Sequence, residues 1–317
     1  MTRHVLVTGG AGFIGSNIAD AYIERGWRVS IIDNLSGGDR RNVNPRAAFH
    51  EVDIRDAAAA DLIRELKPDV INHHAAQMDV RKSVDDPAAD ADVNVVGSLR
   101  ILEAAADAAV KRVVFASTGG AIYGEPVDAL QDESHPTAPL SPYGCAKLAV
   151  EHYLHYYRVV RGLSSVALRY ANVYGPRQNA HGEAGVVAIF AGRLLAGQPS
   201  TINGSGTQTR DFVYVDDVVA ANLAASDAEW QGEYNVGTGV ETSINDLYET
   251  MSSIAGVLLP AHHAEAKPGE QRRSVLDGRR LRALAGLDVP VSIHDGLMRT
   301  MSWFGEKRNW QRSPASG

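Results

Sequence analysis

The sequence predicts an α/β protein with a doubly wound parallel sheet and a smaller α/β unit towards the C-terminus. Short apolar runs alternate with segments of helical periodicity through the first half of the chain, and this alternation is typical of parallel strands joined by helices on both faces. Turn-rich segments at 175–185 and 203–209 then interrupt the pattern, which indicates excursions that cover the carboxyl edge of the sheet. At 317 residues, the chain is long enough for one large core and a smaller lobe.

Each expected strand is a short apolar run, and each expected helix has apolar residues at intervals of three and four. The expected strands are Val5–Val7, Val29–Ile32, Ala48–His50, Asp69–His73, Val113–Ser117 and Ser165–Arg169. The expected helices are Ser16–Arg25, Asp56–Leu66, Asp90–Ala108 and Pro142–Val160.

Composition excludes several classes of protein. The formal net charge of −7 argues against nonspecific binding to nucleic acid. Cys145 is the single cysteine, so no disulfide forms within the chain and a reducing compartment is indicated. No apolar run reaches the ~18 residues of a membrane span, and the chain enters a strand without a signal peptide. We therefore expect a soluble cytoplasmic protein with no membrane partner.

The first motif is TGGAGFIG at Thr8–Gly15, between an expected strand and an expected helix. Gly9 allows a tight turn, Gly12 lets a phosphate approach the backbone, and Gly15 lets the helix pack closely on the strand. The spacing is one residue wider than the G-x-G-x-x-G of many dinucleotide-binding proteins. Asp33 ends the next strand, where an acidic side chain accepts hydrogen bonds from an adenosine ribose. Together these features predict a Rossmann-type fold that binds a dinucleotide.

Residues at the ends of the following strands are less specific. Asp53 follows the third expected strand, and the pattern leaves open whether it contacts adenine or only stabilises the next turn. His73 and His74 are adjacent on a strand, so their side chains point to opposite faces. Without a carboxylate or cysteine at ligand spacing, they predict no metal site.

The second motif is SPYGCAK at Ser141–Lys147. Ser141 followed by Pro142 is typical of an N-cap and a first helical residue. Tyr143 and Lys147 are then four residues apart on one helix face. A helix N-terminus and a nearby ammonium both favour the phenolate, so we expect the pKa of Tyr143 to be lowered and the residue to act as general base for an alcohol. Beside a nicotinamide, such a base indicates hydride transfer.

Taken together, the motifs resemble those of the extended short-chain dehydrogenases/reductases. The segments that carry the resemblance are TGGAGFIG, Asp33, Asn94, ASTGGAIYGE at Ala116–Glu125, SPYGCAK and RYANVYGPRQ at Arg169–Gln178. The resemblance extends over nearly the whole chain and is strongest to the UDP-glucose 4-epimerases. It implies NAD as cofactor, a UDP-sugar as substrate and a homodimer formed through a four-helix interface. Asp33 would repel a 2′-phosphate, which favours NAD over NADP.

The resemblance also implies roles for individual residues. Tyr143 is the implied base, Lys147 binds the nicotinamide ribose and lowers the tyrosine pKa, and Thr118 is the hydroxyl partner of the sugar oxygen. The implied cofactor contacts are Gly9, Gly12, Phe13, Ile14, Gly15, Asp33, Asn34, Asp53, Ile54, Ala75, Ala76, Gln77, Asn94, Tyr143, Lys147 and Tyr170. The implied substrate contacts are Thr118, Tyr143, Asn172, Arg210, Glu270 and Ser274.

Two positions differ among the epimerases that the chain resembles. Met78 stands where some carry a lysine near the cofactor phosphates, a role that Gln77 or Arg81 is placed to take. Ser274 falls where some have a bulky tyrosine and others a small residue that admits a 2-acetamido group. A shifted alignment would instead leave Ser274 on the surface.

By the same resemblance, residues 1–169 form a dinucleotide-binding domain to which 211–240 return, and residues 170–210 and 241–317 form a substrate domain. Gly119 and Gly120 stand where dehydratases and decarboxylases of this fold place an acid. No residue there is expected to catalyse an elimination or decarboxylation after oxidation at C4. We therefore expect a UDP-glucose/UDP-galactose 4-epimerase that passes hydride to NAD, lets the 4-keto sugar rotate and returns hydride to its other face. The alternatives are epimerisation of an N-acetylated, uronate, pentose or dTDP sugar, and a non-catalytic NAD-binding sensor.

Overall fold

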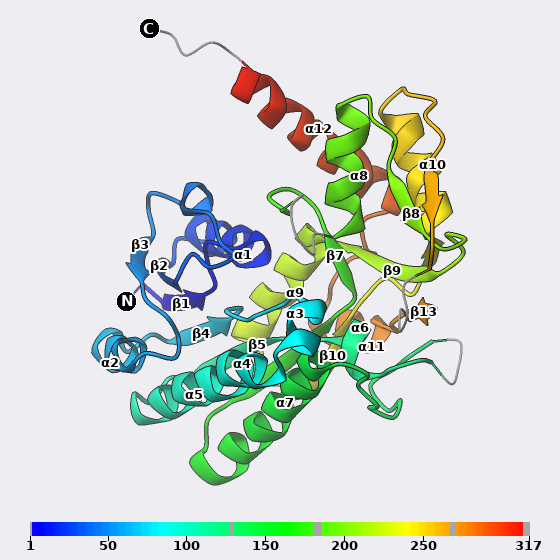
Figure 1. Cartoon of the computed structure of the whole chain (residues 1–317). Coiled ribbons are helices and arrows are strands. Elements are labelled where there is room, and N and C mark those ends of the chain that lie inside the picture. The colour runs from blue at the N-terminus through cyan, green and yellow to red at the C-terminus, as the bar shows by residue number, and fades with distance from the viewer. Residues whose placement is uncertain (1, 127–129, 180–184, 267–270, 313–317) are drawn as a thin grey trace, which may run out of the picture.

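A parallel sheet forms the centre of the computed structural model, which describes residues 2–126, 130–179, 185–266 and 271–312. Within these residues the sheet has seven strands in the order β10-β6-β5-β4-β1-β2-β3 (Figure 1). The strands are β1 (His4–Thr8), β2 (Arg28–Asp33), β3 (Ala48–Glu51), β4 (Val70–His73), β5 (Arg112–Thr118), β6 (Ser165–Tyr170) and β10 (Gly232–Val236). Every neighbouring pair is parallel, which confirms the expected fold class.

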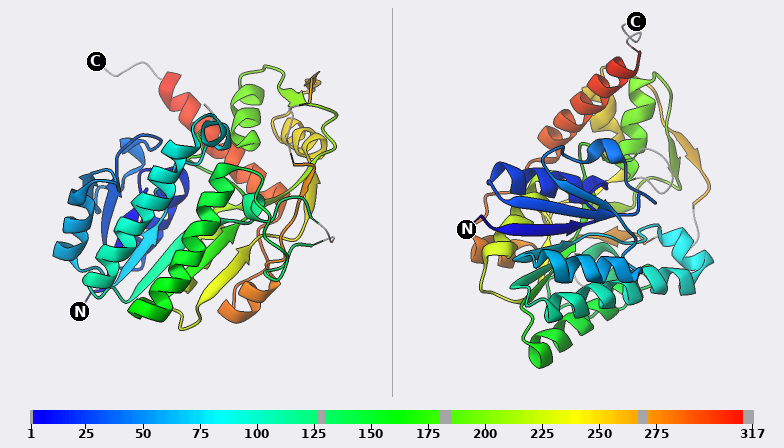
Figure 2. Two further views of the ribbon diagram at one scale, coloured as in Figure 1. Left: turned by 60° about the horizontal axis from the view of Figure 1, so that its bottom comes forward. Right: turned by 90° about the vertical axis from the view of Figure 1, so that its left-hand side faces the viewer.

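Helices cover both faces of this sheet (Figure 2). On one face α1 (Phe13–Glu24) packs against α9 (Val215–Asp227), and on the other α5 (Ser98–Asp107) lies between α2 (Ala57–Leu66) and α7 (Pro142–Arg161). Alternate residues of one strand point to opposite faces: Val5 and Val7 belong to the core under α1, whereas Leu6 belongs to the core under α2 and α5.

One expected helix is wrong in detail. The segment Asp90–Ala108 is divided into the end of α4 (Pro87–Ala91), a π-helical segment at Asp92–Gly97, and α5. The Ser98 hydroxyl donates to the Asn94 carbonyl oxygen at 2.6 Å, and such back-bonding to the carbonyl four residues earlier distorts a helix. π-helical turns are frequent at functional sites. Short helices α3 (Val80–Asp85) and α6 (Gly119–Ile122) follow β4 and β5.

A smaller α/β region lies beyond the carboxyl ends of the sheet. Its strands are β7 (Asn172–Tyr174), β9 (Thr209–Tyr214), β11 (Glu241–Ser243) and β13 (Arg273–Ser274), with β8 (Thr201–Asn203) and β12 (His262–Ala264) as a separate pair. Its helices are α8 (Val186–Leu195), α10 (Ile244–Ile254) and α12 (Ile293–Arg312), which share a third apolar core; α11 (Arg279–Ala285) packs on β10 and α9.

The order of the strands places the candidate site. Strand order reverses between β1 and β4, and in open α/β sheets the crevice at such a reversal binds ligands. Gly9 leaves β1 at this point, and its N–H donates to the Ile32 carbonyl oxygen at 2.8 Å. His74 leaves β4 beside it, with its N–H bonded to the Thr8 carbonyl oxygen at 3.0 Å.

Candidate active site

The glycine-rich turn is built so that side chains are kept out of it. Gly9 has φ +70°, and a Cβ on it would lie 2.6 Å from the Ala75 backbone nitrogen. A Cβ on Gly15 would lie 2.3 Å from the Gly9 carbonyl oxygen. Helix α1 begins at Phe13 after Gly12, and no described side chain caps it. The N–H groups of its first turn are therefore left for an anion such as a pyrophosphate.

Asp33 and Asp53 line the adjacent edge of the sheet. The buried Asp33 carboxylate accepts from the N–H of Ala11 at 2.9 Å and of Leu35 at 2.8 Å, so it holds the glycine-rich turn in place. The side chain of Asn34 donates to Asp53 at 2.8 Å. Asp53 also accepts from Arg55, whose hydrogen bonds hold the pKa of that carboxyl well below its usual range. Asp53 therefore stabilises the local turn, while its contact with adenine stays a prediction.

The basic residues near Asp33 are engaged elsewhere. The Arg40 guanidinium stacks on the Phe49 ring at 3.8 Å from its centroid, and Arg41 forms an ion pair with Asp39. Asp33 itself repels a 2′-phosphate on the ribose. These features fit NAD. The uncapped helix and the space kept by Gly9 suit a pyrophosphate, and the carboxylate of Asp33 suits a ribose without a 2′-phosphate.

The loop after β4 is hydrogen-bonded to the π-helical segment. Gln77 and Asn94 exchange bonds: the Gln77 N–H donates to Asn94 Oδ1, and Asn94 Nδ2 donates to the Gln77 carbonyl oxygen, both at 2.9 Å. Ala75 donates its N–H to Thr8 Oγ1 at 3.2 Å. A Cβ on Gly97 would lie 2.8 Å from Ile54 Cδ1, so the segment also packs closely on the loop after β3. The predicted contacts Ile54, Ala75, Ala76 and Gln77 thus lie on loops that pack on the π-helical segment carrying Asn94.

The two histidines at the end of β4 are structural. His73 bonds to Thr8 Oγ1 at 2.6 Å and to Ser98 Oγ at 2.9 Å, and His74 Nε2 lies 3.0 Å from the Tyr170 hydroxyl. Burial lowers the pKa of each to about 3, so both rings are neutral at physiological pH. The Tyr170 hydroxyl also bonds to Asn222. Tyr170 is therefore held in the interior, with its ring stacked on that of His74, and its contact with a cofactor stays a prediction.

Helix α7 presents the expected tyrosine and lysine. The Ser141 hydroxyl accepts from the Gly144 N–H at 3.1 Å, and Pro142 is the first helical residue, so the predicted cap is confirmed. The Lys147 ammonium lies 5.8 Å from the centroid of the Tyr143 ring. It donates to the Ala116 carbonyl oxygen at 2.9 Å, which fixes it against β5.

The expected lowering of the pKa of Tyr143 is wrong. Burial raises the pKa of Tyr143, and the negative charge of Asp90 raises it further. Burial also lowers the pKa of Lys147 to about 8, against the opposing charges of Asp90 and Glu151. The sequence showed the favourable helix end and ammonium but not the desolvation that outweighs them.

Thr118, Asn172 and Ser274 surround one small space. A Cβ on Gly120 would lie 3.9 Å from Thr118 Oγ1, 3.8 Å from Asn172 Oδ1 and 3.9 Å from Ser274 Oγ. The three hydroxyl and amide groups come from β5, β7 and β13, which are remote in sequence. Ser274 is only 2 % exposed, so the surface alternative for this residue is wrong.

For the other two expected substrate residues, Arg210 and Glu270, the structure gives less information. Arg210 pairs in register with Ser274 across β9 and β13, and its guanidinium donates to the Thr209 carbonyl oxygen at 2.8 Å. Glu270 lies outside the described residues. The role of each in binding stays a prediction.

A buried ion pair behind the site was missed in the sequence. Arg169 and Glu151 are paired at 2.6 Å, and Ser117 donates its hydroxyl to Glu151 at 2.6 Å. The pair ties β6 and α7 to the residue that precedes Thr118. Glu151 follows Lys147 by four residues on the same helix face, a spacing that would have identified it.

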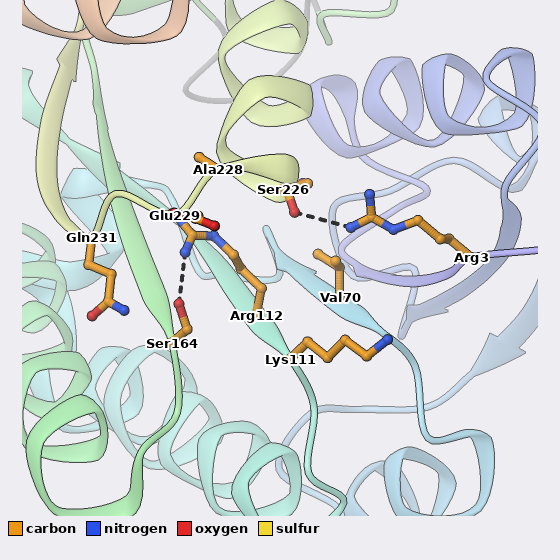
Figure 3. A pocket seen from close by; sticks show the side chains of 9 residues that line it. All are labelled: Arg3, Val70, Lys111, Arg112, Ser164, Ser226, Ala228, Glu229 and Gln231. Atoms are coloured by element: carbon orange, nitrogen blue, oxygen red, sulfur yellow. Dashed lines mark hydrogen bonds between the residues drawn. The ribbon is translucent and has the colours of Figure 1, made fainter.

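A separate pocket lies at the opposite, amino end of the strands (Figure 3). Its basic residues already have partners: Arg112 donates to Ser164 Oγ at 2.7 Å, Lys111 pairs with Asp69 at 2.8 Å, and Arg3 pairs with Asp227. We regard it as structural. In the described part of the chain there is no helix long and apolar enough to cross a membrane, and no group of three or more potential metal ligands.

Comparison with known proteins gives concordant results. The model of the NAD-dependent epimerase/dehydratase family matches residues 5–237. The UDP-glucose 4-epimerase of Mycolicibacterium smegmatis is 44% identical over 308 residues, covering 95% of this chain and 98% of that protein.

Two solved structures are similar over nearly their full length. The UDP-glucose 4-epimerase of Thermotoga maritima with UDP-glucose has a TM-score of 0.94 and 44% identity, covering 96% of this chain and 99% of the other. The UDP-glucose 4-epimerase of Thermus thermophilus in complex with NAD has a TM-score of 0.90 and 44% identity, covering 95% and 98%. Since the family model spans well over half of the sequence, the chain belongs to the NAD-dependent epimerase/dehydratase family, within the extended short-chain dehydrogenases/reductases.

Proposed function

We propose that the protein is a UDP-glucose/UDP-galactose 4-epimerase that retains NAD through each turnover. The observation that carries the proposal is that Thr118, Asn172 and Ser274 gather around Gly120. Gly120 lies on α6, which packs against α7, the helix that carries Tyr143 and Lys147. Similarity to UDP-glucose 4-epimerases over more than nine-tenths of the chain supports this substrate.

Tyr143, Thr118 and Lys147 each have a separate role in the transfer of the proton. Tyr143 takes the proton of the C4 hydroxyl, and Thr118 donates a hydrogen bond to the same oxygen. When this proton later returns to the keto oxygen, Tyr143 becomes a phenolate. The Lys147 ammonium, which is held by the Ala116 carbonyl oxygen, stabilises that phenolate. Bound NAD supplies the hydride acceptor and donor at C4.

The absence of another acid beside Thr118 favours epimerisation over elimination. A Cβ on Gly119 would lie 2.4 Å from Leu276 Cδ1, so no side chain fits there without displacing that leucine. Gly120 carries no acid either, and a Cβ on it would already contact Thr118, Asn172 and Ser274. We therefore expect the oxidised sugar to take its hydride back, and return to the opposite face inverts C4.

The test is an assay of purified protein with a panel of UDP and dTDP sugars and no added cofactor. Interconversion of UDP-glucose and UDP-galactose, with NAD as the nucleotide released on denaturation, is the expected result. Turnover of a different sugar alone would select one of the alternative epimerases. Turnover of none would favour the sensor, and release of NADP would overturn the cofactor assignment.

A second substrate class is favoured by one residue. Ser274 is small and buried beside Thr118 and Asn172, which leaves room for the methyl group of a 2-acetamido substituent and a hydroxyl for its polar end. UDP-N-acetylglucosamine is accordingly a further substrate of the proposed enzyme.

The assembly follows from the exposed face of α7. Tyr153, Tyr156, Val159 and Val160 are all more than two-fifths exposed there, and α5 packs alongside. Single exposed apolar residues are ordinary, but a contiguous group marks an interface. We infer that two copies pair through α5 and α7 as a four-helix interface.

The domain division and location are proposed on similar grounds. Residues 1–169 with 211–240 would bind the dinucleotide, and residues 170–210 and 241–317 would bind the nucleotide sugar. The single free cysteine and the nucleotide ligands support a cytoplasmic location.

A further inference from the structure

Asp90 is a buried carboxylate that the proposed chemistry does not use. It lies on α4 and is only 2 % exposed. Its Oδ1 accepts from Gln77 Nε2 and from Asn94 Nδ2, both at 2.9 Å. Its Oδ2 is buried and has no hydrogen-bond partner among the described residues. Burying a carboxylate without an ion pair is costly, so its presence calls for a compensating role.

The two partners of Asp90 connect it to the candidate cofactor loop. Gln77 and Asn94 also bond to each other through their backbone and side-chain groups. Asp90, Gln77 and Asn94 therefore form a closed triangle of hydrogen bonds, here called the loop clamp. It joins the loop after β4 to α4 and to the π-helical segment, and both of these pack against α7.

The charges around Lys147 single out Asp90. On α7, Glu151 faces Lys147 but is neutralised by its ion pair with Arg169. On β4, His73 and His74 are neutral, since burial lowers the pKa of both to about 3. On β5 the partners of Lys147 are the Ala116 carbonyl oxygen and the Phe115 ring. Asp90 is thus a buried carboxylate that acts on the charge of Lys147 and, among the described residues, has no ion pair of its own.

We propose that Asp90 is a positioning residue for the reaction: it holds the loop clamp in place and supplies the counter-charge for Lys147. The proposal rests on the proposed roles of Tyr143 and Lys147. Two consequences can be separated by experiment, because the clamp needs a hydrogen-bond acceptor whereas the counter-charge needs a negative charge.

Asp90→Asn keeps the shape and one acceptor oxygen but removes the charge. The negative charge raises the pKa of both Tyr143 and Lys147, so its loss lowers both. Both limbs of the pH profile of kcat are therefore expected to move to lower pH, on the order of 0.5–1 unit. Asp90→Glu, which keeps the charge, should leave the limbs where they are even if kcat falls.

Asp90→Ala removes the acceptor as well. Its NAD content, measured by denaturing the purified protein and quantifying the nucleotide per chain, should fall at least several-fold below that of Asp90→Asn. Asp92→Asn is the matched control: this exposed carboxylate two residues on pairs with Arg55, and its removal should change neither the pH profile nor the NAD content.

The outcomes distinguish this proposal from the proposed function. An unmoved pH profile in folded Asp90→Asn would overturn the counter-charge, and normal NAD content in Asp90→Ala would overturn the clamp. Loss of activity at every pH without a shift would mean that Asp90 is merely structural. Failure of the wild type to interconvert UDP-glucose and UDP-galactose would instead refute the function itself.

Discussion

At the scale of single residues, the proposed chemistry depends on the phenol of Tyr143. Replacing it with phenylalanine removes the base while leaving the ring that packs in the site. We expect kcat to fall by at least ~10²–10⁴, with the melting temperature and NAD content unchanged. Thr118→Val should cost less, since it removes a hydrogen bond and no proton acceptor.

The control for this substitution is Tyr153→Phe. Tyr153 is exposed on the same helix, and its loss of a hydroxyl should not alter turnover. Near-normal kcat in Tyr143→Phe, measured beside this control, would show that the proton is taken by another group.

We propose that substrate range also depends on one residue, Ser274. Wild type is expected to epimerise both UDP-glucose and UDP-N-acetylglucosamine, because Ser274 leaves space beside Thr118 and Asn172. Ser274→Tyr should abolish turnover of the acetamido sugar and retain that of UDP-glucose, whereas Ser274→Ala should retain both. Competition kinetics with the two sugars measure the ratio of kcat/KM. Equal loss of both activities in the tyrosine variant would contradict this interpretation of the pocket.

At the scale of elements, the turn between β1 and α1 depends on an absence of side chains. Gly9→Ala places a methyl group 2.6 Å from the Ala75 backbone nitrogen, so the loop after β4 must move. We expect the variant to lose most of its bound NAD and activity. The nucleotide released per chain on denaturation measures the loss.

Gly26→Ala is a matched control for backbone strain. Gly26 has φ +76°, close to the +70° of Gly9, but nothing lies within 4 Å of a Cβ built on it. Both variants bear the ~1–2 kcal/mol cost of a left-handed conformation in a residue other than glycine. If Gly9→Ala and Gly26→Ala reduced the NAD content equally, backbone strain alone would explain the role of Gly9. The close approach of Gly9 to the Ala75 backbone would then not be needed.

At the scale of the whole molecule, the proposed dimer interface is the exposed face of α7. Val159 and Val160 are 67% and 61% exposed in the single chain. Wild type should therefore elute as a dimer in size-exclusion chromatography with light scattering, and the double variant Val159→Asp/Val160→Asp as a monomer. Val289→Asp, which changes an apolar residue 89% exposed elsewhere, should remain dimeric. A monomeric wild type would contradict the interface.

The sequence by itself determined the features that depend on neighbours along the chain. Alternating apolar runs predicted the strands of the parallel sheet from β1 to β6. Ser141 and Pro142 predicted the start of α7, because capping acts within one helical turn. The glycines between Thr8 and Gly15 predicted the tight turn for the same reason, since their effect is on the local backbone.

Only the tertiary structure decided the features that combine distant segments. The pKa of Tyr143 is raised because burial by other segments and the charge of Asp90 outweigh the helix end and Lys147, which are the only influences visible in SPYGCAK. The space beside Thr118 takes its walls from β7 and β13, more than 50 and 150 residues away in the chain. Burial and electrostatic potential are sums over everything packed around a group, so they become defined only when the chain has folded.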